Sequence, residues 1–282
     1  MIAYLNGKFI PAEEIKISPF DRGFLFADGI YEVVRSYSGK LFMFGEHLKR
    51  MERGLGEIKI NFPGLNELEK ISYDLIKKNP SETKSDCSLY IQITRGISFP
   101  RKHAFPPSST KPTIFISLSQ IKTKAENNKD GVKVILSDDF RWSRCDVKTI
   151  GLLPAVLAYQ NAIDDDASES IWVRNNLICE GSHTNFFAVK NGIVVTPPLS
   201  KFILPGITRK AVLAICRKSN IPVREEEILK ENLKELDEVF ITGTLTEINP
   251  VVQIDDIKIG NGKPGEVTKR IQAEFKIATL SK

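Results

Sequence analysis

The chain has 282 residues, of which 41% are hydrophobic and 27% are charged, a composition ordinary for a folded protein of one large or two smaller domains. Forty Lys and Arg side chains against 35 Asp and Glu side chains give a formal net charge of +5. The two signs are interleaved and no apolar run approaches membrane-spanning length, so the sequence predicts neither a nucleic-acid-binding surface nor a membrane segment.

The first 121 residues predict a small unit of mixed helices and strands. Residues 4–10 form a hairpin signal around the turn Asn6-Gly7. Apolar side chains recur at helical spacing in 46–58 and again in 65–76, which predicts two helices. Strands are expected where β-branched and aromatic residues concentrate, at 30–37, 87–94 and 112–119.

A polar stretch at 122–131 ends in Asp130-Gly131 and marks the expected boundary between a domain of residues 1–121 and one of residues 122–282. The second domain carries two amphipathic stretches, 155–163 and 208–219, that predict helices. Its expected strands are 132–136, 170–174, 185–189, 193–196 and 238–242.

The four cysteines are scattered, and no two form a C-x-x-C pair. This pattern indicates reduced thiols rather than a disulfide framework or a zinc site. The first residues also lack the charged-then-apolar layout of a signal peptide. We therefore expect a cytoplasmic protein without a metal site.

Lys148 and Glu180 are the first candidates for chemistry. Lys148 follows a predicted strand and precedes the apolar stretch 150–157, where its amine could be desolvated and act as a nucleophile. Most lysines are solvated surface charges, and that alternative stays open for Lys148. Glu180 precedes Gly181, so an ordinary turn acid is its alternative.

Two small-residue turns follow these candidates, at 204–208 and at 242–244. The first opens a predicted helix, and such turns offer backbone N–H groups to a phosphate, although each is equally an ordinary helix cap or loop. A lysine, an acid and two such turns are together what an enzyme needs to hold pyridoxal 5'-phosphate. The lysine forms a Schiff base with the aldehyde, and the acid keeps the ring nitrogen protonated.

A loop stiffened by prolines, 99–107, carries Arg101 and His103. Arginine can bind a substrate carboxylate through two hydrogen bonds, so the loop is a candidate clamp. A solvated surface loop is the alternative.

From Asp21-Arg22-Gly23-Phe24 to Gly265-Glu266-Val267-Thr268 the chain resembles the fold-type IV pyridoxal-phosphate enzymes, and most of all the D-amino acid aminotransferases. The most telling stretches are 28–34, 46–50, 101–103, 144–148 and 180–182. The resemblance implies an α+β fold with a small N-terminal α/β domain and a larger C-terminal domain with a barrel-like β core. It also implies a homodimer with shared active sites.

The resemblance implies a role for each site residue. Lys148 would be the Schiff-base lysine and proton shuttle, and Glu180 would pair with the pyridine nitrogen. The phosphate would be held by Arg50, Ile207, Thr208 and Thr244, and Leu204 would pack against the ring. The substrate α-carboxylate would be bound by Tyr31, Arg101 and His103, the last two from the neighbouring subunit.

The implied activity is transamination between D-alanine or D-glutamate and a 2-oxo acid such as pyruvate or 2-oxoglutarate. Alternatives within the fold type are a branched-chain L-amino acid aminotransferase and an aminodeoxychorismate lyase. A non-catalytic cofactor-binding protein is disfavoured because both Lys148 and Glu180 are present.

Three residues depart from the pattern. Phe99 looks like an insertion before Arg101, and His183 stands where a smaller hydroxyl residue is expected. Arg35 shares a strand face with Tyr31, so it could bind a distal substrate carboxylate if it pointed inward.

Overall fold

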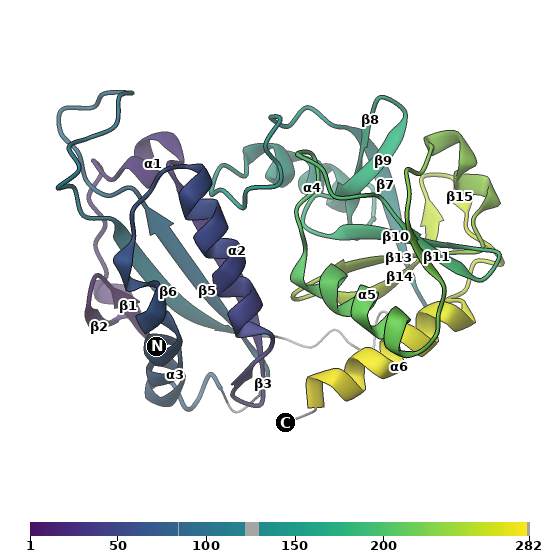
Figure 1. The fold of residues 1–282 in the computed structure, drawn as a ribbon, viewed down its shortest axis with the longest axis horizontal. Coiled ribbons are helices and arrows are strands. Elements are labelled where there is room, and N and C mark those ends of the chain that lie inside the picture. The colour runs from purple at the N-terminus through teal and green to yellow at the C-terminus, as the bar shows by residue number, and fades with distance from the viewer. Residues whose placement is uncertain (84, 122–129, 281–282) are drawn as a thin grey trace. The chain divides into compact units, whose positions relative to one another are not determined.

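The computed structural model describes residues 1–83, 85–121 and 130–280, which fall into two compact units (Figure 1). Unit 1 comprises Met1–Lys122 together with Val147–Gly151, and unit 2 comprises Thr123–Asp146 with Leu152–Lys282. The expected domain boundary adjoins the stretch 122–129, which lies outside the described residues, so a division after residue 121 stays a prediction.

Unit 1 is built on an antiparallel sheet of order β2-β1-β6-β5-β3-β4. Its strands are β1 (Ile2–Leu5), β2 (Lys8–Pro11), β3 (Gly29–Tyr37), β4 (Lys40–Leu41), β5 (Cys87–Thr94) and β6 (Thr113–Gln120). Asn6 and Gly7 both have positive φ, 47° and 92°, as a two-residue hairpin turn requires, so the predicted hairpin is confirmed. The three other strands predicted here are confirmed to within one residue at each end.

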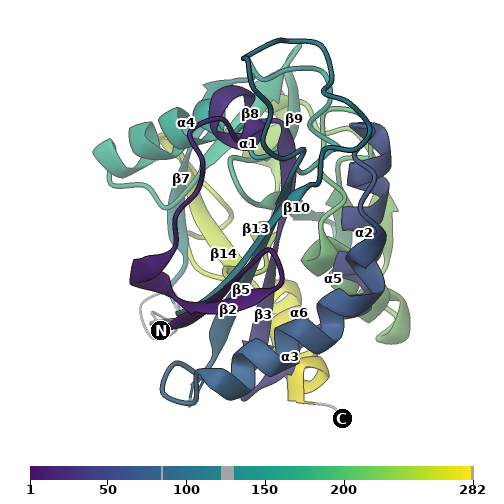
Figure 2. The same ribbon diagram turned by 90° about the vertical axis from the view of Figure 1, so that its left-hand side faces the viewer.

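Two helices, α2 (Phe44–Glu57) and α3 (Leu68–Lys78), lie over one face of this sheet (Figure 2). Their apolar faces bury Met51, Leu55 and Leu75 against the inward side chains of β3, β5 and β6. The second helix begins three residues later than predicted, because Pro63–Glu67 forms a 3₁₀ helix first. The short helix α1 (Arg22–Phe26) and the 3₁₀ helix Ala12–Glu14 were not predicted.

Unit 2 contains a closed β-barrel. The sheet runs in the order β12-β11-β10-β13-β14-β7-β8-β9, and β9 pairs again with β10 through Glu180 and Asn185. The strands are β7 (Val132–Asp138), β8 (Ser170–Arg174), β9 (Leu177–Gly181), β10 (Asn185–Lys190), β11 (Ile193–Thr196), β12 (Val223–Glu225), β13 (Glu238–Gly243), β14 (Glu247–Ile254) and β15 (Ile257–Lys258). Buried apolar side chains of these strands form one cluster, so the expected α+β fold with a barrel-like core is confirmed.

Three helices and a 3₁₀ helix accompany the barrel: α4 (Leu153–Asp164), α5 (Ile207–Lys218), α6 (Glu266–Leu280) and Lys230–Glu235. The predicted helices at 155–163 and 208–219 correspond to α4 and α5. The sequence did not predict α6, β9 or β14. Strand β14 contains Pro250, which lacks the N–H that a sheet ladder uses, yet Pro250 pairs in register with Phe240.

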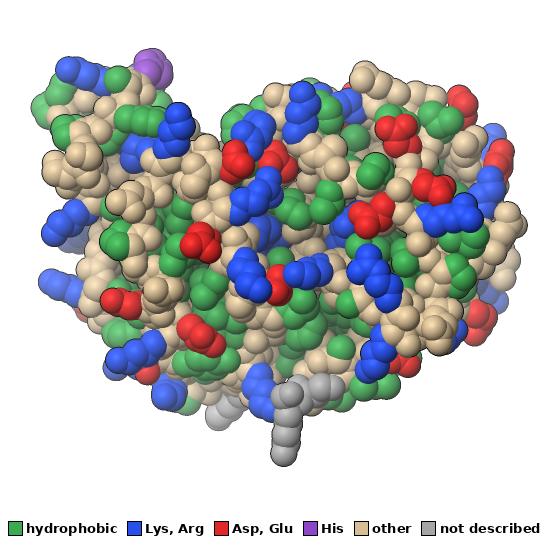
Figure 3. Space-filling model, in the orientation of Figure 1, with side chains coloured by type: hydrophobic (Ala, Val, Ile, Leu, Met, Phe, Trp, Pro, Cys, Tyr) green, Lys and Arg blue, Asp and Glu red, His purple; other side chains and the backbone are tan. Residues whose placement is uncertain are grey.

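Helix α4 has an unusual surface. Of its residues only Ala158 and Ala162 are buried, whereas Leu153, Val156, Leu157 and Ile163 are exposed. Elsewhere, on the face of unit 2 that Figure 3 presents, basic and acidic side chains are interspersed. None of the helices in the described part of the chain is long and apolar enough to cross a membrane.

Candidate active site

Lys148 lies in the segment Val147–Gly151, which belongs to unit 1 although both flanking stretches belong to unit 2. The backbone N–H of Tyr31 donates to the carbonyl of Lys148 at 3.0 Å, and the N–H of Ile150 donates to the carbonyl of Gly29 at 3.1 Å. A bridge between Ile30 and Thr149 lies between these two bonds. The first part of β3 therefore fixes the backbone that carries the lysine.

The amine of Lys148 is ordered by one aromatic side chain. Its Nζ donates to the Tyr31 hydroxyl at 3.2 Å and lies 4.3 Å from the centroid of the same ring. Lys148 and Ile150 are half-buried, whereas Leu152 and Leu153 of the same apolar stretch are 40% and 68% exposed. Desolvation of the amine stays a prediction, and Tyr31 is the group that orients the lysine.

Glu32, which was not predicted, connects β3 to α2 on the opposite face of the strand. Its carboxylate accepts two hydrogen bonds from Arg50, from Nε and from Nη2, each at 2.7 Å. The Nδ1 of His47 lies 2.7 Å from the same carboxylate. A bidentate pair of this kind fixes the arginine in one geometry.

The electrostatics of this buried trio follow from its contacts. Burial raises the pKa of Glu32, but the charge and hydrogen bonds of Arg50, together with His47, outweigh burial and hold that pKa at about 2. Burial lowers the pKa of His47, the charges of Arg50 and Lys148 add to this, and Glu32 compensates only in part. At neutral pH, His47 is therefore uncharged and Glu32 is ionised.

Arg35 does not serve the distal role considered for it. Its guanidinium binds Asp86 at 3.0 Å and lies 4.8 Å from the centroid of the Tyr37 ring. A carboxylate of its own chain thus already neutralises this cation.

Arg101 and His103 lie in an exposed loop of unit 1 and share one contact. The guanidinium carbon of Arg101 lies 4.3 Å from the centroid of the Phe26 ring, and the His103 ring lies 5.4 Å from it. Phe99 is 75% exposed and packs edge-on against Phe20. The side chain of Phe99 thus packs on Phe20, and its being an insertion stays a prediction.

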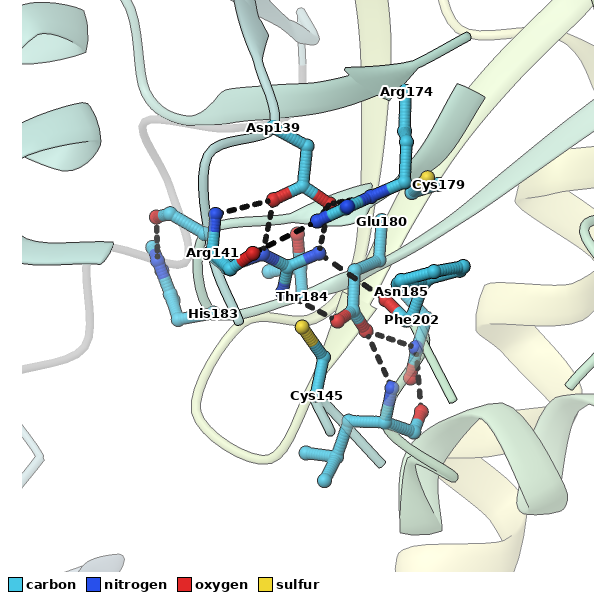
Figure 4. Close-up of polar contacts among 12 residues, drawn as sticks. Asp139, Arg141, Cys145, Arg174, Cys179, Glu180, His183, Thr184, Asn185 and Phe202 are labelled. Carbon is cyan, nitrogen blue, oxygen red and sulfur yellow. Dashed lines mark hydrogen bonds and ion pairs between the residues drawn. The ribbon is translucent and has the colours of Figure 1, made fainter. Parts of the chain in front are cut away.

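In unit 2, the carboxylate of Glu180 is buried and held by three donors (Figure 4). Arg141 Nη1 donates to Oε1 at 2.7 Å. Asn185 Nδ2 and the backbone N–H of Leu204 donate to Oε2 at 3.1 and 3.0 Å. The alternative of an ordinary exposed turn acid is therefore wrong, because Glu180 sits at the pairing that closes the barrel.

Arg141 was not predicted, because in the sequence nothing distinguishes it from the other Lys and Arg residues. Its Nε and Nη2 donate at 2.9 and 3.0 Å to the carboxylate of Asp139, whose side chain is fully buried, and Arg174 binds the same carboxylate (Figure 4). Burial lowers the pKa of Arg141, but Asp139 and Glu180 outweigh it and raise the pKa overall. The two carboxylates of Asp139 and Glu180 are thus matched by the two guanidinium groups of Arg141 and Arg174.

The two predicted small-residue turns also lie in unit 2, although Thr242 and Gly243 end strand β13 and the second turn itself spans 244–246. Gly206 precedes α5, and no side chain caps this helix, so the first N–H groups, at Ile207 and Thr208, point out of the helix N-terminus. A Cβ added at Gly206 would lie 1.9 Å from Asn185 Oδ1, and one added at Gly243 would lie 3.4 Å from Thr184 Cγ2. Thr184 and Asn185 are adjacent residues, so the start of β10 brings the two turns together, with Thr244 directly after Gly243.

A second unpredicted acid, Glu169, supports the turn 182–184. It is fully buried, and its oxygens accept from the backbone N–H of Ser182 at 3.1 Å and from Thr184 Oγ1 at 2.8 Å. His183 Nδ1 lies 3.0 Å away, and the His183 ring contacts the Tyr159 ring edge-on. Burial raises the pKa of Glu169, but His183 and the hydroxyls of Ser182 and Thr184, which both donate to it, outweigh burial and lower the pKa. The unusual His183 thus partners a buried carboxylate.

Comparison with known proteins identifies the family. A family model described as amino-transferase class IV matches residues 29–254. The chain belongs to this family. Among its relatives, the D-alanine aminotransferase of Staphylococcus haemolyticus is 39% identical over 273 residues, covering 96% of this chain and 95% of the relative. The D-alanine aminotransferase of Bacillus licheniformis is 36% identical over 282 residues, covering 100% and 98%.

Solved structures of other family members share the fold. The branched-chain amino acid aminotransferase of Escherichia coli superposes with a TM-score of 0.88 at 28% identity, covering 98% of this chain and 93% of that chain. The branched-chain aminotransferase of Thermoproteus uzoniensis with norvaline gives 0.86 at 26% identity, covering 99% and 95%. The similarity thus extends over both units of this class IV family member.

Within each unit, the structure shows direct contacts between some of the predicted site residues. In unit 1 it joins Lys148 to Tyr31, and it places Arg101 and His103 on one ring. Arg50 is held by Glu32 on the other face of β3. In unit 2 it joins Glu180 to the backbone of Leu204.

Proposed function

We propose that this family member is a pyridoxal 5'-phosphate-dependent D-amino acid aminotransferase. It would transfer the amino group of D-alanine or D-glutamate to a 2-oxo acid such as pyruvate or 2-oxoglutarate. The observation that carries the proposal is the 39% identity, over 96% of the chain, to the D-alanine aminotransferase of Staphylococcus haemolyticus.

The residues present fit this cofactor. The cofactor aldehyde reacts with an amine, and the half-buried Lys148 supplies one. A pyridine nitrogen calls for a buried carboxylate, and Glu180 is buried and ionically balanced by Arg141. A phosphate calls for N–H donors, and the uncapped start of α5 supplies them.

We therefore assign Lys148, Glu180, Arg50, Leu204, Ile207, Thr208 and Thr244 as the residues that hold the cofactor. When bound, the cofactor supplies an electron-withdrawing ring that stabilises negative charge on the substrate Cα. Lys148 would be the base that takes the proton from the substrate Cα and delivers it to the cofactor carbon C4'. Tyr31 orients the lysine amine through its hydroxyl, and Glu180 would accept a hydrogen bond from the protonated ring nitrogen.

Substrate recognition is assigned to Tyr31, Arg101 and His103, which would bind the α-carboxylate. Both loop residues are exposed in the single chain, which supports their serving a neighbouring subunit. The exposed apolar residues of α4 support a homodimer as well, because contiguous exposed apolar surface is typical of a protein interface. A cytoplasmic location stays our prediction.

The test is a half-reaction without an amino acceptor. The protein loaded with pyridoxal phosphate is mixed separately with D-alanine, D-glutamate and L-leucine, and the cofactor absorbance is followed. We expect conversion to the pyridoxamine form with the two D-amino acids. Lys148→Ala should abolish this conversion, because no base of matching position remains, and wild-type rates in that variant would refute the assigned role.

The alternatives give different outcomes. Conversion by L-leucine but not by D-alanine would assign the chain to the branched-chain aminotransferases, whose solved structures share its fold. Pyruvate release from aminodeoxychorismate without an acceptor would assign it to the lyases. Failure to bind the cofactor would refute the proposal altogether.

A further inference from the structure

The loop that carries Arg101 and His103 is not held by an apolar core. Residues 101–105 are all exposed, so their position depends on polar and aromatic contacts with the rest of unit 1. Two residues of α1, a helix of five residues that the sequence did not predict, make several of those contacts.

Arg22, the first residue of α1, donates hydrogen bonds to the loop backbone. It is only 4% exposed, and its Nη1 donates to the carbonyls of Lys102 at 2.7 Å and Ala104 at 3.2 Å. Its Nη2 donates to the carbonyl of His103 at 3.3 Å. One planar guanidinium thus binds three consecutive peptide groups, which fixes the curvature of the loop at His103.

Asp28 fixes Arg22 in turn. Its Oδ2 accepts from Arg22 Nε and from Arg95 Nε, each at 2.8 Å, and Arg95 also donates to the carbonyls of Ile58 and Lys59. The guanidinium of Arg95 lies 3.8 Å from the centroid of the Phe105 ring. The far end of the loop is therefore tied to the same carboxylate.

Phe26, the last residue of α1, orders the two side chains. The backbone bends at His103, and the side chains of Arg101 and His103 both contact the Phe26 ring. An arginine that already rests on an aromatic face loses less rotational freedom when it binds a carboxylate.

We propose that Arg22 and Phe26 are positioning residues for substrate-carboxylate recognition. Arg22 sets the backbone of the loop, and Phe26 pre-orders Arg101 and His103 before the substrate arrives. This inference rests on the proposed function, since it takes the carboxylate-binding role of Arg101 and His103 from there.

The experiment compares Arg22→Lys, Phe26→Leu and Arg101→Ala in the cofactor-loaded enzyme. Arg22→Lys keeps the charge beside Asp28 and loses the planar fork. We expect each of the first two to raise KM for D-alanine about three- to tenfold, with kcat changed by less than about twofold. The Ki of propionate, a carboxylate without an amine, should rise by the same factor, because only carboxylate binding is weakened.

Two controls separate positioning from general damage. Lys102→Ala removes an exposed side chain from the same loop while its carbonyl still binds Arg22, so KM should not change. Phe26→Tyr keeps the ring and should retain the wild-type KM. If Arg22→Lys fails to fold, Phe26→Leu and Phe26→Tyr carry the test alone.

The outcomes test the positioning role of Arg22 and Phe26 separately from the proposed aminotransferase function. An increased KM in Arg101→Ala with unchanged KM and Ki in Arg22→Lys and Phe26→Leu would overturn the positioning role and leave the function standing. An unchanged KM in Arg101→Ala would refute the carboxylate-binding role and the inference with it. A fall in kcat without a change in KM would also overturn the inference.

Discussion

Replacing Glu32 by Gln tests how strongly the buried trio of Glu32, Arg50 and His47 stabilises unit 1. The pKa of Glu32 is about 2 in the fold against 4.5 for the free group. Each pKa unit corresponds to about 1.4 kcal/mol, so the ionised carboxylate contributes about 3 kcal/mol to the free energy of unfolding at neutral pH. Removing one partner of a buried ion pair costs a similar amount, about 3–5 kcal/mol.

The stability that Glu32 contributes depends on pH. The folded protein holds Glu32 ionised where the unfolded chain takes up a proton, so this stability is complete above about pH 4.5 and is lost as the pH falls toward 2. Urea unfolding followed by circular dichroism should therefore show Glu32→Gln about 3 kcal/mol less stable at pH 7. The difference should shrink progressively below pH 4.5.

Glu52→Gln is the matched control, because Glu52 is an exposed acid on the helix that also carries Arg50 and His47. It should change the free energy of unfolding by less than about 0.5 kcal/mol. A loss below about 1 kcal/mol in Glu32→Gln, or a loss that does not vary with pH, would refute the reasoning.

Three further changes can be predicted. The pKa of His47 is lowered in the fold, so the free energy of unfolding of the wild type should fall as the pH drops below about 6.5, by at most about 1.4 kcal/mol per pH unit. In His47→Gln, urea titrations between pH 7 and 5 should show a shallower dependence of the free energy of unfolding on pH. Gly206→Ala places a methyl group 1.9 Å from Asn185 Oδ1, so absorbance titration should show cofactor affinity lowered about tenfold, whereas Gly56→Ala, which points into open space, should leave it unchanged. Leu153→Asp puts a charge on the exposed apolar face of α4 and should shift a dimer to monomers in analytical ultracentrifugation; an unchanged dimer would exclude α4 from the interface.

Local patterns predicted most of the regular structure. The hairpin at Asn6-Gly7 and the long strands are encoded by turn residues and β-branched runs a few residues apart, so they could be found from the sequence. Helix α1 is only five residues long, and β14 contains Pro250, so neither carries the usual local signal. Their formation depends on partners far along the chain.

The candidate site divides in the same way. Lys148 and Glu180 could be named because their flanking residues resemble a family pattern. Arg141 and Glu32 could not, because Arg141 meets Glu180 across 39 positions and Glu32 meets Arg50 across 18, and no spacing rule connects such pairs. A charged side chain that is buried requires a paired partner, and which side chains are buried is known only from the folded structure.

The segment Val147–Gly151 limits how this chain can be divided. The polypeptide enters unit 1 a second time at residue 147 and leaves it at residue 151, after pairing with β3. A gene cut after residue 121 would encode a first fragment that lacks the lysine and leaves the carbonyl of Gly29 and the N–H of Tyr31 without these strand partners. Its second fragment would carry the lysine on a loop with no strand to order it. The two units are therefore not interchangeable modules, and any recombination between relatives that preserves the lysine's position must carry β3 and this segment together.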